Sequence, residues 1–116
     1  MECEFNSIMN ELRDNLAMIG IEYPQNLEDF QDILAELNSE DYFSLLEQFI
    51  IFVCVQGEDL QGLITKQEKL NHLTAKYVSE LRLLLEIGKA IVMDERNKEP
   101  NDMIEYFRDK ILRIKF

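Results

Sequence analysis

The sequence has no tryptophan, four glycines, two prolines and one histidine in 116 residues. All-β domains need many turns and usually carry more glycine and proline, so this scarcity favours helices. Two cysteines, Cys3 and Cys54, are too few for a disulfide framework, and Cys54 lies in an apolar run that suits a small buried residue. These absences predict an all-α protein of a reducing compartment, the cytoplasm or alternatively the nucleus.

No apolar stretch is long enough to span a membrane. The longest, residues 42–55 (YFSLLEQFIIFVCV), falls short of the roughly 20 residues that a spanning helix needs. Residues 1–4 are acidic where a secretory signal requires positive charge. We therefore expect no membrane contact and no export signal.

Basic residues are almost missing from the first half of the chain. Residues 1–62 hold fourteen Asp or Glu and one basic residue, Arg13, whereas residues 63–116 hold nine acids and eleven bases. The net charge of −11 repels phosphate, so direct nucleic-acid binding is not expected. The acidic half is either a solvated face that keeps the protein soluble or a surface for a basic partner.

Apolar residues at three- and four-residue spacing predict helices over residues 4–19 and 27–37. Gly20 suits the C-terminal cap of the first helix, and Asn26 suits the N-terminal cap of the second.

Residues 42–55 are predicted to be a third, buried helix that Ser39 caps and that Gln56 and Gly57 end. A buried strand over 49–55 is the rival interpretation, because this part is rich in β-branched and aromatic residues.

A long fourth helix is predicted over residues 58–95. Five apolar residues recur there at intervals of seven: Leu63, Leu70, Tyr77, Leu84 and Ile91. This degenerate heptad either packs within the chain or forms a surface shared with another chain. A capping-box pattern at Thr65 and Glu68 indicates a break near Ile64 as the alternative.

A polar hinge over 96–100 precedes a C-terminal helix over 101–116. Four apolar residues of this helix, which we call the C-terminal stripe, have coiled-coil-like spacing: Ile104, Phe107, Ile111 and Ile114. The pattern stops at Phe116 without a cap, so the helix either docks by its end or continues in a longer parent protein.

No pattern of catalytic or ligand-binding residues stands out. His72 shares a helix face with Glu68, but a bundle metal site needs a second Glu-x-x-His and further carboxylates. Residues 94–102 lack the alternating oxygen ligands and the glycine of a calcium loop. We therefore expect no enzyme activity, no catalytic residue, no metal and no cofactor.

The sequence thus predicts one domain over 1–116, a compact bundle of five or six helices with an acidic three-helix body over 1–57. Its expected function is non-enzymatic: a dimerising scaffold or adaptor that binds a protein partner, or a second copy as a homodimer, through amphipathic helices. The C-terminal stripe is the predicted binding surface. The alternative is a small acidic inhibitor or chaperone that engages a basic surface of its partner.

Overall fold

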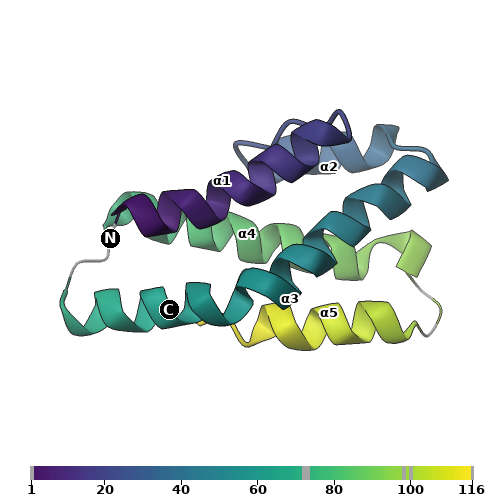
Figure 1. Cartoon of the computed structure of the whole chain (residues 1–116). Helices are drawn as coiled ribbons and strands as arrows, with labels where there is room; N and C mark the ends of the chain where they lie inside the picture. The colour runs from purple at the N-terminus through teal and green to yellow at the C-terminus, as the bar shows by residue number, and fades with distance from the viewer. Residues whose placement is uncertain (1, 72–73, 98, 100, 116) are drawn as a thin grey trace. The chain divides into compact units, whose positions relative to one another are not determined.

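The computed structural model describes residues 2–71, 74–97, 99 and 101–115, without the side chains of residues 2 and 3. These residues form five α-helices and one short 3₁₀ helix, with no strand among them (Figure 1). The all-α prediction is therefore confirmed, and the strand interpretation of 49–55 is wrong.

Contacts within the chain divide it into two compact units, Met1–Phe52 and Val53–Phe116, called unit 1 and unit 2. This division does not test the expectation of one domain over 1–116, which stays a prediction.

Unit 1 contains α1 (Glu2–Met18), α2 (Leu27–Glu36) and the first part of α3 (Ser39–Lys69). Gly20 adopts a left-handed conformation with φ 81°, as its predicted role at the end of α1 requires. The Asn26 side chain accepts a hydrogen bond of 2.8 Å from the backbone N–H of Asp29, so the predicted cap of α2 is confirmed.

Apolar residues at helical spacing make up most of the core of unit 1. The Phe30 and Phe49 rings meet edge to face, with centroids 6.1 Å apart and planes at 76°. Both are buried, together with Phe5, Met9, Leu12, Leu16, Leu34, Tyr42, Leu45, Leu46 and Phe52.

α3 is longer than predicted and begins differently. Asn38, not Ser39, caps it, because its side-chain oxygen accepts a 2.8 Å hydrogen bond from the N–H of Asp41. Gly57 does not end the helix, so the predicted boundary at Gln56 and Gly57 is wrong. A helical glycine costs only about 1 kcal/mol, and the buried face continues beyond it through Leu60 and Ile64.

The predicted long helix over 58–95 is two helices, so the longest helix is the third and not the fourth. Asn71 has a φ of 57°, a left-handed conformation that asparagine tolerates. Thr74 then caps α4 (Ala75–Met93) by accepting a hydrogen bond from the N–H of Tyr77. The capping-box interpretation of Thr65 is wrong, because its hydroxyl donates back to the Gln61 carbonyl inside α3.

This break interrupts the heptad, with Leu63 on α3, Leu70 just after its end and the other three members on α4. Leu63 is half-buried and Leu70 is exposed, whereas the three members on α4 are buried. The heptad therefore forms no continuous coiled-coil stripe.

The predicted hinge over 96–100 begins inside a 3₁₀ helix, Glu95–Asn97, and its residues 98 and 100 lie outside the described residues. Asn101 caps α5 (Asp102–Leu112) by accepting a hydrogen bond from the N–H of Met103. The predicted helix over 101–116 is thus shorter at its C-terminal end. Beyond the end of α5, the Gln61 side chain hydrogen-bonds the backbone of Lys115, as described below.

Candidate functional site

The C-terminal stripe lies in the interior. All four of its side chains are buried, and α5 packs against α4 within unit 2. Ile114 follows the end of α5 and is buried although it is not helical. A partner would reach Ile104, Phe107 and Ile111 only if α5 left its position, and binding through the four residues of the stripe stays a prediction.

The packing of α5 against α4 depends on Gly88. A Cβ atom built at Gly88 would lie 2.7 Å from Ile111 Cγ1 and 3.3 Å from Ile111 Cδ1. The missing side chain lets the two helices approach at this point.

We expect Gly88→Ala to lower the free energy of unfolding by about 1–2 kcal/mol, because overpacking outweighs the gain in helix propensity. Gly62→Ala is the matched control, since nothing lies within 4 Å of a Cβ there. It should raise the free energy of unfolding by about 0.5–1 kcal/mol. Urea denaturation measures both, and a stabilising Gly88→Ala would contradict the close approach.

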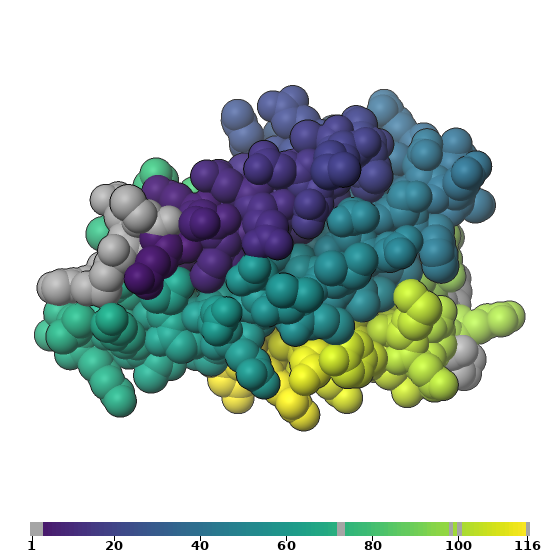
Figure 2. All heavy atoms as spheres, viewed as in Figure 1, coloured from purple at the N-terminus to yellow at the C-terminus, as the bar shows by residue number. Residues whose placement is uncertain are grey.

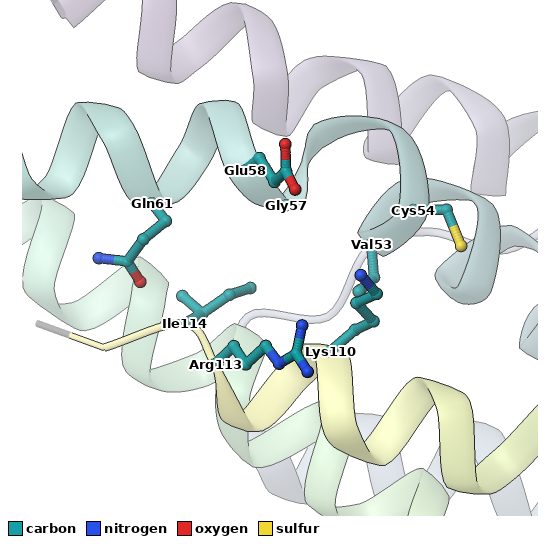
Figure 3. A pocket seen from close by; sticks show the side chains of 8 residues that line it. All are labelled: Val53, Cys54, Gly57, Glu58, Gln61, Lys110, Arg113 and Ile114. Atoms are coloured by element: carbon teal, nitrogen blue, oxygen red, sulfur yellow. The ribbon is translucent and has the colours of Figure 1, made fainter.

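A hollow of about 140 Å³ lies between the second part of α3 and the end of α5, entirely within unit 2 (Figure 3). On the face drawn in Figure 2, the yellow atoms of α5 border the teal atoms of α3. Residues of both helices and of the segment after α5 line the hollow: Val53, Cys54, Gly57, Glu58, Gln61, Lys110, Arg113 and Ile114. We call it the α3–α5 hollow.

At one end of the α3–α5 hollow, the Gln61 side chain hydrogen-bonds the backbone of Lys115. Its side-chain nitrogen donates to the Lys115 carbonyl at 3.0 Å, and its side-chain oxygen accepts from the Lys115 N–H at 2.7 Å. The paired amide bonds hold the segment after α5 against α3. Ile114, next to the anchored residue, is thereby kept in the wall of the hollow.

Two cations lie at the edge of the α3–α5 hollow. Figure 3 shows Lys110 and Arg113 extending from the α5 side, with Glu58 across from them on α3. Among the described residues, neither cation has a carboxylate within ion-pair distance; the Lys110 ammonium lies 5.4 Å from the centre of the Tyr106 ring. The hollow therefore combines an apolar floor with positive charge that no described residue pairs.

Tyr106 and Cys54 meet beside this hollow. A hydrogen bond to the Cys54 side chain is the largest cause that raises the pKa of the Tyr106 phenol above its ordinary value, and the electrostatic interaction with Cys54 and desolvation act in the same direction. Arg113 acts in the opposite direction. The phenol is therefore neutral at physiological pH, and Cys54 is a free, exposed thiol instead of the buried residue expected.

Unit 1 carries the whole net charge of the chain. It contains twelve acids and one base, Arg13, whereas unit 2 contains eleven of each. The side chains of eleven of those twelve acids are described, and all eleven are exposed. Arg13 donates a hydrogen bond to Asn10 and lies 5.3 Å from the centre of the Tyr23 ring. The described surface of unit 1 is thus strongly negative.

The other candidates from the sequence lie partly outside the described residues. His72 lies outside the described residues, and so does the side chain of Cys3. Within the described part of the chain, no cluster of three or more His, Cys, Asp or Glu side chains could hold a metal ion. No helix there is long and apolar enough to cross a membrane.

Comparison of the chain with protein-family models, curated proteins and solved structures finds no match. Two features of the structure bear on function, the α3–α5 hollow and the acidic surface of unit 1.

Proposed function

We propose that the protein is a non-enzymatic protein-binding module, a scaffold or adaptor, that receives an amphipathic helix of its partner in the α3–α5 hollow. The observation that supports this function best is the combination, in one hollow, of an apolar floor and two cations at its edge that no described carboxylate pairs. The free, exposed Cys54 suits the reducing cytoplasm or nucleus proposed as its compartment.

The size of the hollow fits one large apolar side chain. An apolar cavity of roughly 150 Å³ accommodates benzene, and this hollow measures about 140 Å³. Interfaces commonly place a single aromatic or aliphatic anchor in such a pocket, where it supplies much of the binding energy. The floor at Val53, Gly57 and Ile114 offers the apolar contact that this anchor needs.

The cations at the edge of the hollow determine which residues of the partner helix are favourable next to its apolar anchor. Lys110 and Arg113 favour a helix with carboxylates one turn before and after its apolar anchor. Each exposed ion pair contributes only about 0.2–1 kcal/mol. The anchor therefore provides the affinity, and the ion pairs orient the helix and reject basic partners.

A synthetic helical peptide tests this function. It carries one phenylalanine with glutamates three residues before and four residues after it, and fluorescence anisotropy follows its binding. Gly57→Leu places a leucine side chain in the wall of the hollow and should abolish binding, whereas Gly62→Leu, outside the hollow on the same helix, should preserve it. Lys110→Gln with Arg113→Gln should weaken binding about fivefold.

Arg108→Gln is the control for the loss of a positive charge outside the hollow, because Arg108 is exposed on α5 but does not line the hollow. It should leave the dissociation constant within twofold. No binding of the peptide, or equal binding by the Gly57→Leu and Gly62→Leu proteins, would rule out the hollow as the binding site.

A second candidate function is that of a small acidic inhibitor or chaperone that engages a basic protein surface through unit 1. The eleven exposed acids of that unit favour it. In the same assay a lysine-rich peptide should then bind independently of Gly57→Leu. Its affinity should fall steeply between low and high salt, whereas docking of an apolar anchor should depend on salt only weakly.

A further inference from the structure

The surface of the chain itself carries an aromatic side chain of a size that fits the α3–α5 hollow. Phe43 on α3 is 55% exposed and is the one exposed phenylalanine in the part of the chain that the structure describes. Glu40 and Glu47, three residues before it and four after it, share its helix face and are exposed. Neither carboxylate has an ion-pair partner among the described residues.

Unit 1 thus presents an aromatic ring between two carboxylates, and unit 2 presents an apolar hollow beside two cations. We propose that the α3–α5 hollow of one copy of this chain binds Phe43 of a second copy, with Glu40 and Glu47 facing Lys110 and Arg113. This inference rests on the proposed protein-binding function and names its partner as the chain itself.

The contact is heterologous, because the two surfaces that meet are different parts of the chain. Each copy has one Phe43 and one hollow, so copies join head to tail. The repulsion between two chains of net charge −11 opposes the contact at long range. At about 0.15 M salt the Debye length is about 8 Å, so ion pairs in direct contact persist while the long-range repulsion is screened.

Glu58 weakens the contact without preventing it. It lies on the α3 wall of the hollow, whereas Lys110 and Arg113 lie on the α5 side. The lining of the hollow therefore keeps a positive excess, which faces the carboxylates beside Phe43.

Analytical ultracentrifugation of the intact chain at about 0.15 M salt tests the proposal. The mean mass of the wild type should rise above the 13.7 kDa of one chain as the concentration increases. Phe43→Ala should weaken self-association about 30-fold. Leu112→Ala, which removes a similarly exposed apolar side chain from α5, should not change it.

Mixing two variants gives the most specific result. Phe43→Ala retains an open hollow, and Gly57→Leu retains Phe43, so each variant alone should be monomeric at concentrations where the wild type just associates. Their equimolar mixture should form a complex of two chains that grows no further. Circular dichroism confirms that both variants fold.

Three results would overturn the proposal: a wild type that stays monomeric, a Phe43→Ala protein that associates like the wild type, or a mixture that stays monomeric. A protein that binds the synthetic peptide but not a second copy would overturn the self-association alone. A protein that binds neither would contradict the proposed function as well.

Discussion

Replacement of Phe49 by alanine is expected to lower the free energy of unfolding by about 3–5 kcal/mol. The Phe49 side chain has no exposed area and meets the Phe30 ring edge to face at 6.1 Å. Removing it costs the transfer free energy of the ring, the contact with Phe30 and the cavity left behind. A domain is typically stable by about 5–15 kcal/mol, so the loss is a large share of the total.

Phe43→Ala is the matched control for this change. Phe43 lies on the same helix but is largely exposed, so its truncation should change the free energy of unfolding by less than about 0.5 kcal/mol. Urea denaturation followed by circular dichroism measures both variants. Equal effects of the two truncations would mean that the core of unit 1 is misplaced.

The second large effect is expected for the double substitution Phe107→Asp and Ile111→Asp. Both side chains are buried, so the variant places two unpaired carboxylates in the interior of unit 2. Burying an unpaired charge costs several kcal/mol, and two such charges approach the whole stability of a domain. We expect unit 2 to unfold, with loss of the helical circular dichroism of α4 and α5.

Met103→Asp with Leu112→Asp is the control, because it introduces the same two carboxylates at exposed apolar positions of α5. It should change the free energy of unfolding by about 1 kcal/mol or less. If the Phe107→Asp and Ile111→Asp protein instead stayed folded and lost only its association with a partner, the C-terminal stripe would be a binding surface after all.

The sequence predicts the helices of unit 1 well because their signals are local. Gly20 and Asn26 mark helix ends through their own backbone and side-chain chemistry, and the apolar spacing identifies the buried face around Phe30 and Phe49. Each signal acts within about four residues, so no knowledge of distant contacts is needed.

The errors in unit 2 have different physical causes. Gly57 was expected to end a helix, but the buried face that runs on through Leu60 outweighs the cost of one glycine. Thr65 and Glu68 fit a capping box, whereas Asn71 and Thr74 supply the actual break. Where two local signals of similar strength compete, side-chain packing determines which residue ends the helix. That packing cannot be read directly from the sequence.

The α3–α5 hollow was not predicted because its walls are far apart in the chain. Gln61 and Lys115 are joined by two hydrogen bonds across 54 positions. Lys110 and Arg113 have a sufficient local explanation at the end of a helix, where they offset its dipole. Only the fold brings them to the edge of an apolar hollow, where no carboxylate of the described residues pairs with them.

The central claim is that a partner helix binds at the α3–α5 hollow and leaves α5 in place. Titration of the isotopically labelled protein with the synthetic peptide, followed by amide NMR, tests it most directly. We predict that the shifted amide signals cluster at Gly57, Gln61 and Arg113 while those of the buried part of α5 keep their dispersion. Shifts confined to unit 1, or collapse of the α5 signals as the C-terminal stripe is released, would contradict the claim.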